Sequence, residues 1–322
     1  MTPLVSVKIL IVGAGAVGSL LGALLEEGGL SVHLVARSDH VAAIEKQGLR
    51  VSGRRTRVVH LDATDAVPPG LEVDAVVVTS KTFDLTEAAT ELARAITPRP
   101  TLFLQNGLGI LPLAQDALRS GGWTDPQPYT VRGVNSLPAT YVGPGEVREA
   151  GVGEILLPVP GEAGPSAGAA RLFRMLFEGA RVPVEAVPEF EREVWRKALI
   201  NAAVNPVTAV HGIPNGELLK EPRRTEALEL LGEALAVARA AGFGFTSEEV
   251  TRDFERIVRA TAANRSSMLQ DLDRGRPTEV DAISGEILRE AARHGLDLPA
   301  TQAIVAQVSA LASRARPGAQ PS

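Results

Sequence analysis

Three glycines directly follow the first apolar run of the chain, in the segment Gly13-Ala14-Gly15-Ala16-Val17-Gly18. Residues 7–12 before them are typical of a strand, and the Ala- and Leu-rich residues 17–27 are typical of a helix. In such a strand–turn–helix unit the glycines permit a tight turn, close approach of a pyrophosphate, and close packing of the helix. The helix N-terminus presents N–H groups to the phosphates. We therefore predict that residues 13–18 bind a dinucleotide; the alternative is a glycine-rich turn without a ligand.

Short apolar runs alternate with helical patterns through the first part of the chain. Residues 31–36, 74–79 and 101–104 are further strand-like runs, and residues 129–160 contain more strands and turns. Strands that alternate with helices are typical of a parallel sheet covered on both faces. The sequence therefore predicts an α/β fold with an N-terminal, Rossmann-type, doubly wound parallel sheet.

The pattern changes to almost continuous helix after Pro188. Helical patterns occupy residues 189–204, 225–241, 247–273 and 278–294, and Gly242, Gly275 and Gly295 stand where helices commonly end. We therefore expect a cofactor-binding domain in residues 1–187, a C-terminal all-α domain in residues 188–315, and a flexible tail in residues 316–322.

The composition excludes several classes of function. The chain of 322 residues has no cysteine, which excludes disulfides, thiol catalysis and Cys-ligated metals. Its five histidines are scattered without metal-ligand spacing, so we expect no metal site. The net charge of −5 provides no basic surface for nucleic acid. The first apolar run is too short to span a membrane and lacks a basic leader segment, so we expect a cytoplasmic protein without a membrane partner.

The end of the second predicted strand indicates which dinucleotide is bound. An NAD-specific site has Asp or Glu about 20 residues after the glycines, where it accepts a hydrogen bond from a ribose hydroxyl. Here that strand ends in Ala36-Arg37-Ser38. Arg37 cannot accept such a bond, but it can pair with a 2′-phosphate. We therefore predict NADP(H) rather than NAD(H); the alternative is an ordinary surface arginine.

A polar stripe lies in the first helix of the predicted all-α domain. Lys197, Asn201 and Asn205 are spaced four residues apart in an otherwise apolar run, so they share one helix face. Burying such groups is costly unless they bind something. The alternative is a solvated face on which Lys197 pairs with Glu193. Since Pro206 should end or kink the helix, we expect the stripe to open on a cleft.

Two further groups of polar residues lie downstream. Asn264 and Ser267 fall within a helical pattern and would share a face, which is as compatible with solvation as with ligand binding. Thr278 and Asp281 suggest a capping box, which places Glu279 in the first turn of a helix. An acid there commonly compensates the helix dipole. The same position favours an ionised carboxylate that can accept a hydrogen bond from a substrate hydroxyl.

Taken together, these motifs resemble those of the ketopantoate reductase (2-dehydropantoate 2-reductase) family over nearly the whole chain. No single motif is specific, but their order is. The motifs are the glycine loop at residues 13–18, Lys81, Gln105-Asn106-Gly107, Lys197-x-x-x-Asn201-x-x-x-Asn205-Pro206, Pro214-Asn215-Gly216-Glu217-Leu218, Ser266-Ser267-Met268-Leu269-Gln270-Asp271 and Thr278-Glu279-Val280-Asp281.

The resemblance implies a two-domain enzyme whose helical domain closes over a small 2-keto acid. It implies that Lys197 is the general acid and that Glu279 orients the substrate. It also implies that the substrate is held by polar residues, namely Asn106, Asn201, Asn205, Asn215, Asn264 and Ser267. Asn106 and Glu279 are further expected beside the cofactor, and Arg37 and Lys81 beside its 2′-phosphate.

The reaction that the resemblance implies is reduction of 2-dehydropantoate to (R)-pantoate by NADPH, on the route to pantothenate and coenzyme A. The alternatives are reduction of another 2-keto acid or an imine, or a non-catalytic NADP-binding protein. Two departures from the family pattern concern residues 135–150: Leu137-Pro138 replaces a His-Gly or similar turn, and Glu149 stands where a histidine is common. The oligomeric state stays open, a homodimer being one option.

Overall fold

Two compact units make up the protein in its computed structural model, which describes residues 7–53 and 56–314. One unit runs to Phe190 except for Asn106–Leu108, and the other comprises Asn106–Leu108 and the chain from Glu191 onward. The division therefore falls three residues beyond the boundary expected from the sequence (190 against 187). The tail expected in residues 316–322 lies outside the described residues.

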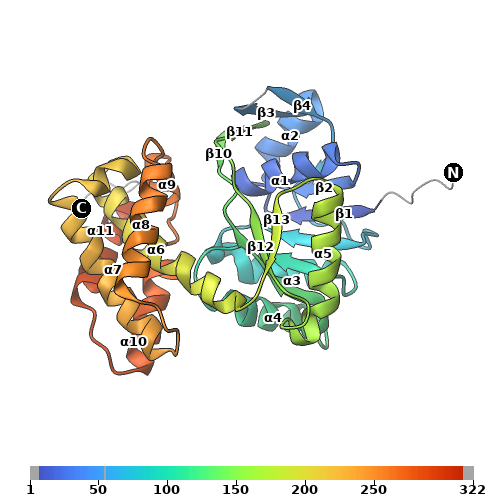
Figure 1. Cartoon of the computed structure of the whole chain (residues 1–322). Coiled ribbons are helices and arrows are strands. Elements are labelled where there is room, and N and C mark those ends of the chain that lie inside the picture. Colours follow the sequence, from blue (N-terminus) through green and yellow to red (C-terminus); the bar gives the residue numbers. More distant parts are fainter. Residues whose placement is uncertain (1–6, 54–55, 315–322) are drawn as a thin grey trace. The chain divides into compact units, whose positions relative to one another are not determined.

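The first unit is built on a six-stranded sheet in which every neighbouring pair of strands is parallel. Its strands are β1 (Lys8–Val12), β2 (Ser31–Val35), β5 (Asp62–Thr64), β6 (Ala75–Val78), β7 (Thr101–Phe103) and β8 (Thr130–Arg132). Their order, β5-β2-β1-β6-β7-β8, is that of a doubly wound dinucleotide-binding sheet. The predicted fold class is thus confirmed (Figure 1).

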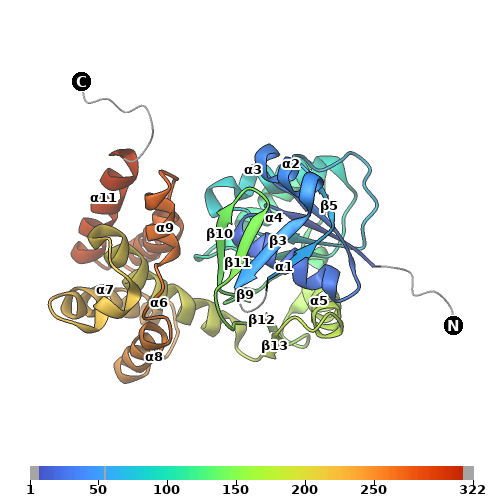
Figure 2. The same cartoon turned by 90° about the horizontal axis from the view of Figure 1, so that it is seen from above.

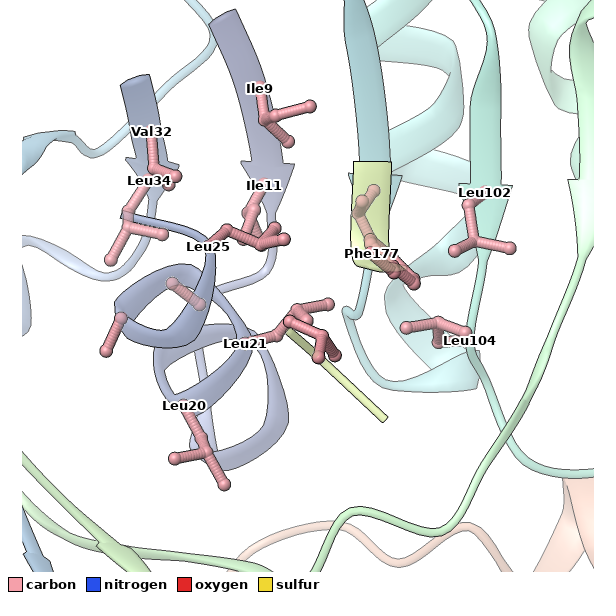
Figure 3. Close-up of a cluster of buried hydrophobic side chains, with 14 of the residues drawn as sticks. Ile9, Ile11, Leu20, Leu21, Leu25, Val32, Leu34, Leu102, Leu104 and Phe177 are labelled. Atoms are coloured by element: carbon pink, nitrogen blue, oxygen red, sulfur yellow. The ribbon is translucent and has the colours of Figure 1, made fainter. Parts of the chain in front are cut away.

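Helices cover both faces of this sheet because the side chains of a strand alternate between its faces. Ile9 and Ile11 of β1 pack with α1 (Ala16–Glu27), α2 (Ser38–Gln47) and α5 (Ala167–Gly179). Figure 3 shows Ile11 beside Leu25 of α1, and all of these side chains belong to one buried cluster. Leu10 and Val12 instead pack with α3 (Leu85–Ala95) and α4 (Ile110–Gly121). The β1 strand is therefore buried from both sides.

Two smaller sheets complete the first unit. Strands β10 (Ala139–Gly143), β11 (Glu146–Glu149), β3 (Leu49–Gly53) and β4 (Arg57–Val59) form one of them in that order. Figure 2 shows β10, β11 and β3 of this sheet side by side. Strands β13 (Val184–Val187), β12 (Ile155–Pro158) and β9 (Val134–Asn135) form the other. The strands expected in residues 129–160 are thus present. Short 3₁₀ turns link the elements at η1 (Thr82–Asp84), η2 (Gln127–Tyr129) and η3 (Gly164–Ser166).

The second unit is helical, as predicted. It contains α6 (Phe190–His211), η4 (Asn215–Leu219), α7 (Arg223–Ala240), α8 (Ser247–Ala260), α9 (Ser267–Asp273), the π-helix η5 (Asp281–Gly285), α10 (Glu286–Arg293) and α11 (Pro299–Arg314). Leu199 and Val207 of α6 belong to the same buried core as Leu230, Phe254 and Ile287. Within the described ranges, none of the helices has the length and hydropathy needed to cross a membrane.

Pro206 is expected to end or kink the polar helix, and the first of these two outcomes is wrong. Helix α6 continues through Pro206 to His211, and Asn205, Pro206, Val207 and Thr208 are all buried. A proline in a helix removes one backbone donor. The Thr208 hydroxyl lies 2.8 Å from the carbonyl oxygen of Val204 and 3.0 Å from that of Asn205, so it can donate to this turn. Burial of the residues that follow the proline favours continuation of the helix.

The long helix expected over residues 247–273 is also interrupted. The buried positions of α8 end at Val258, and none of the residues from 259 to 265 is buried, so nothing anchors a continued helix there. A new helix begins after Ser266, whose hydroxyl caps α9 by accepting from the Leu269 amide at 3.2 Å. Asn264 consequently lies in the connecting loop and does not share a helix face with Ser267.

The helix expected to start at Thr278 begins two residues later. Val280 is its first helical residue, and no side-chain capping bond is formed at that position, so the predicted capping box is absent. Glu279 precedes the helix, and its carbonyl oxygen accepts from the Ile283 amide at 3.0 Å. A π-turn follows at Asp281–Gly285. Because Glu279 and Val280 are both buried, local packing sets this start.

A buried histidine joins the glycine loop to the small four-stranded sheet. His40 is 1% exposed, and its Nδ1 accepts from the Gly145 amide at 2.8 Å. The imidazole is therefore neutral with its proton on Nε2, which lies 3.0 Å from the Ser19 hydroxyl. That hydroxyl donates to the carbonyl oxygen of Ala14 at 3.2 Å. Burial lowers the pKa of His40; Asp39 opposes this shift and Arg37 adds to it.

We expect this network to weaken in acid. An unfolded histidine binds a proton near pH 6.5, whereas buried His40 does so only at lower pH. The unfolded state therefore binds more protons in this window, and the free energy of unfolding falls as the pH drops below about 6.5. Urea unfolding of the wild type and of His40→Gln at pH 7.5, 6.5 and 5.5 isolates the contribution of His40 to the pH dependence of stability. Burial also lowers the pKa of His33, but His33 is present in both proteins, so its effect is common to both. Parallel pH curves for the two proteins would contradict the expectation.

Candidate active site

The loop between β1 and α1 presses against the end of β6. Gly13 has a φ of +91°, and a side chain at this position would collide with the Ser80 backbone. A side chain at Gly18 would collide with the Thr79 hydroxyl, which itself donates to the Gly13 carbonyl oxygen at 3.0 Å. Both positions therefore require glycine, as the motif predicts.

Gly15, in contrast, faces open space. A Cβ atom at this position would meet nothing within 4 Å among the described residues. Gly15 is also the N-cap of α1 and provides no side-chain cap. The amides of the first turn of a helix have no partners within the helix, and the helix dipole favours an anion there. The loop thus fits a phosphate group held by the first-turn amides of residues 16–18, since the Ala14 and Gly15 amides donate to the carbonyl oxygens of Val35 and Gly13.

Arg37 and Lys81 lie on opposite sides of this loop. In the sheet, Val12 of β1 pairs with Val35 of β2 on one side and with Val78 of β6 on the other. Arg37 follows β2 and is exposed, and its guanidinium lies over the Tyr141 ring, 5.9 Å from the centroid. Lys81 follows β6 and is half-buried. The first unit therefore brings the glycine loop, Arg37 and Lys81 to the carboxyl edge of three adjacent strands.

The polar stripe lies along α6 in the second unit. Lys197 and Asn201 are half-buried, and Asn205 is only 5% exposed. Leu199 and Ile200 beside them are buried. A solvated face, the alternative reading of the stripe, does not fit the burial of Asn205, whereas half-buried Lys197 and Asn201 fit either reading. The Thr208 hydroxyl lies 2.7 Å from the Ser266 hydroxyl, which ties α6 to the start of α9.

Asn215 and Asn264 are brought together by the loop that replaces the expected long helix. The Asn215 amide donates to the Asn264 carbonyl oxygen at 2.9 Å, and Asn215 Nδ2 donates to the Thr261 hydroxyl at 3.0 Å. Asn215 is 8% exposed, and its Oδ1 accepts no hydrogen bond from any residue that the structure describes. A buried acceptor without a protein partner is an expected ligand contact. Ser267, by comparison, is exposed at the start of α9.

Asn106 and Glu279 are in direct contact, and both belong to the second unit. Asn106 Nδ2 donates to Glu279 Oε2 at 3.3 Å, and Glu279 is 6% exposed. The following Gly107 has a φ of +98°, and a side chain there would collide with the Ala282 carbonyl oxygen. Two segments far apart in the sequence, residues 106–107 and 279–282, are thus closely packed around a buried carboxylate.

Several neighbours of these residues were not identified from the sequence. Gln105 is buried, and its Nε2 donates to the carbonyl oxygens of Val78 and Ser80 at 3.1 and 3.3 Å. Gln105 precedes Asn106 in the Gln105-Asn106-Gly107 motif, so its place in that motif could have identified it from the sequence. Tyr141 and Asp271 are also buried. Nothing in the sequence near Arg37 indicates that Tyr141 lies against it.

Comparison with known proteins identifies the relatives of this chain. Residues 9–161 match the family described as Ketopantoate reductase PanE/ApbA, and residues 189–312 match the Ketopantoate reductase PanE/ApbA C terminal family. A 2-dehydropantoate 2-reductase of Archaeoglobus fulgidus is 34% identical over 292 residues, which cover 90% of this chain and 92% of that protein.

Solved structures show the same architecture. The PanE/ApbA family ketopantoate reductase from Ralstonia eutropha JMP134 is 30% identical, with a TM-score of 0.83, and the match covers 96% of this chain and 99% of that one. A ternary structure of D-mandelate dehydrogenase with NADH and anilino(oxo)acetate is 24% identical, with a TM-score of 0.86 and coverage of 96% and 99%, and shares the fold. Because two family matches and a full-length relative agree, the chain belongs to the ketopantoate reductase family, a family of oxidoreductases.

Proposed function

We propose that the protein reduces 2-dehydropantoate to (R)-pantoate with NADPH, on the route to pantothenate and coenzyme A. The observation that carries the proposal is the half-buried Lys197, which heads a polar stripe on a helix with an apolar core face, in a chain of the ketopantoate reductase family. The relative from Archaeoglobus fulgidus, which bears the name of this reaction, supports it.

A nicotinamide dinucleotide fits the first unit. The first-turn amides of residues 16–18 would hold its pyrophosphate, since Gly15 leaves space for it and α1 points its N-terminus there. Arg37 and Lys81 would hold the adenosine 2′-phosphate, which favours NADPH over NADH. When bound, the reduced nicotinamide supplies a hydride for the C2 carbonyl carbon of the keto acid.

Lys197 is the proposed general acid. An alkoxide develops on the C2 oxygen during reduction, and a lysine ammonium group, ordinarily protonated at neutral pH, can stabilise that charge and then donate its proton. Asn201 and Asn205 lie one and two turns further along the same face of α6. Their amides can orient the keto acid without adding a competing charge.

The buried acceptors of the second unit are suited to a hydroxylated substrate. The Glu279 carboxylate is held by Asn106 and can accept a hydrogen bond from the terminal hydroxyl of 2-dehydropantoate. The orphan Oδ1 of Asn215 is a second acceptor. Asn264 and Ser267 complete the proposed set of substrate contacts. A keto acid without a hydroxyl would leave the Asn215 Oδ1 acceptor unpaired.

A second candidate function is reduction of another 2-keto acid. The fold shared with D-mandelate dehydrogenase favours testing it, since that enzyme acts on a 2-hydroxy acid with an aromatic side chain. The two candidates differ in the substrate side chain that the polar acceptors must accommodate.

The substrate and the cofactor are tested together. We expect kcat/KM for 2-dehydropantoate to exceed that for 2-ketoisovalerate, which lacks the hydroxymethyl group, by about 10²-fold, because this acid would leave the buried Asn215 acceptor unpaired. Phenylglyoxylate should also be a poor substrate. With NADH in place of NADPH, KM for the cofactor should rise. Equal, weak rates across the three acids would reject 2-dehydropantoate as the dedicated substrate, and a preference for NADH would reject the cofactor assignment.

The role of Lys197 has a matched control in the same unit. Lys197→Ala should lower kcat by about 10²- to 10⁴-fold, the range that general acid catalysis contributes, while circular dichroism and Tm stay close to the wild type. Lys220→Ala removes a lysine from an exposed ion pair with Glu217 and should leave kcat unchanged. Near-normal turnover of Lys197→Ala would exclude Lys197 as the acid.

The contact between Asn106 and Glu279 can be displaced without changing either residue. In Gly107→Ala, the new methyl group collides with the Ala282 carbonyl oxygen, so the two segments must separate and kcat/KM should fall by about tenfold or more. Gly212→Ala is the control, because Gly212 also has a positive φ (+64°) but has open space around it. This substitution adds only backbone strain of about 1 kcal/mol. Similar losses of kcat/KM in both variants would show that strain, not displacement, is responsible.

A further inference from the structure

Tyr141 occupies an unexpected place beside the predicted 2′-phosphate residue. It lies on β10, is 7% exposed, and presents its ring to two side chains of the α2 start. The Arg37 guanidinium lies 5.9 Å from the ring centroid, and the His40 ring lies 5.1 Å from it at an angle of 52°. The chain has only two tyrosines, so a contact between Arg37 and a tyrosine is not explained by a high tyrosine content.

The strand that carries Tyr141 is fixed to α2 by contacts other than the ring. The Gly145 amide in the turn between β10 and β11 donates to His40 Nδ1 at 2.8 Å. Gly145 also packs so closely on Ala43 that a Cβ atom there would come within 2.8 Å of the Ala43 methyl group. The Tyr141 ring is thus held in a defined position relative to the first turn of α2.

The Arg37 guanidinium lies over this ring and forms no ion pair with a described residue. Arg37 is the N-cap of α2, and its side chain is exposed. An exposed arginine side chain has many rotamers, and ordering it on binding costs affinity. An aromatic face attracts and orients a guanidinium without neutralising its charge. The charge therefore stays available to an incoming phosphate.

We infer that Tyr141 is a positioning residue that holds Arg37 for the 2′-phosphate and thereby sets the preference for NADPH over NADH. The inference rests on the proposed use of NADPH. It assigns the effect to the aromatic ring and to the 2′-phosphate alone, so the rest of the dinucleotide should bind equally well without Tyr141.

Calorimetric binding of adenosine 2′,5′-bisphosphate and of 5′-AMP tests this directly, because the two ligands differ only in the 2′-phosphate. In Tyr141→Leu we expect the Kd of the bisphosphate to rise about three- to tenfold, the effect of losing one cation–π contact, while the Kd of AMP stays unchanged. Tyr141→Phe keeps the ring and should bind both ligands like the wild type. If the leucine variant unfolds, Tyr141→Met, whose flexible side chain fills the same space, replaces it.

The Arg37→Ala background separates this inference from the cofactor proposal. There, adding Tyr141→Leu should cause no further loss of bisphosphate binding if Tyr141 acts only through Arg37. A wild type that binds the bisphosphate no better than AMP would overturn the NADPH assignment and the inference with it. A wild type that prefers the bisphosphate, with an unchanged preference in Tyr141→Leu, would overturn the inference alone. An equal loss for both ligands would also overturn it, since it indicates general support of the fold.

Discussion

The close approach of the glycine loop to the end of β6 is the constraint on which the first unit depends. Gly13 lies against the Ser80 backbone and Gly18 against Thr79, and any side chain at either position would push α1 away from the sheet. Gln105 supports the same corner, since its amide bonds the carbonyl oxygens of Val78 and Ser80. Because the loop, β6 and β7 are joined here, the N-terminus of α1 keeps a fixed position at the edge where Arg37 and Lys81 emerge.

The second unit is organised around the cost of placing polar groups in an apolar helix bundle. Asn205, Asn215 and Glu279 are all buried, although each lies next to side chains of the core. Pairing offsets part of this cost: Asn106 bonds Glu279, and Thr261 bonds Asn215. The acceptor left on Asn215 is not compensated by the described residues. A buried acceptor of this kind is tolerated where a ligand completes it, which is the physical reason for the proposal that substrate contacts lie in this unit.

The sequence predicted the parts of the structure that depend on local pattern. The glycine loop, the strand runs beside it and the change to helices after Pro188 each follow from short-range periodicity or backbone requirements, and the fold class is confirmed. The errors arose where packing overrides local preference. Helix α6 passes Pro206 because the following turn is buried, and the pattern of residues 247–273 breaks where buried positions cease. Contacts such as Asn106 with Glu279, or Arg37 with Tyr141, join segments that are distant in the sequence, so no local pattern reveals them.

The segment that departs from the family pattern contributes to the scaffold of the first unit. Glu149 of β11 pairs with Arg57 of β4 at 3.2 Å, and Arg57 also pairs with Glu27 of α1 at 2.7 Å, so Arg57 links the two strands to a helix. Pro138 accepts from the Ala150 amide at 2.7 Å, which closes the base of the β10–β11 hairpin. These contacts fix the hairpin that carries Tyr141 beside Arg37. The departures are therefore accommodated within the first unit, in the hairpin beside Arg37, and the proposed substrate residues of the helical unit are not among them.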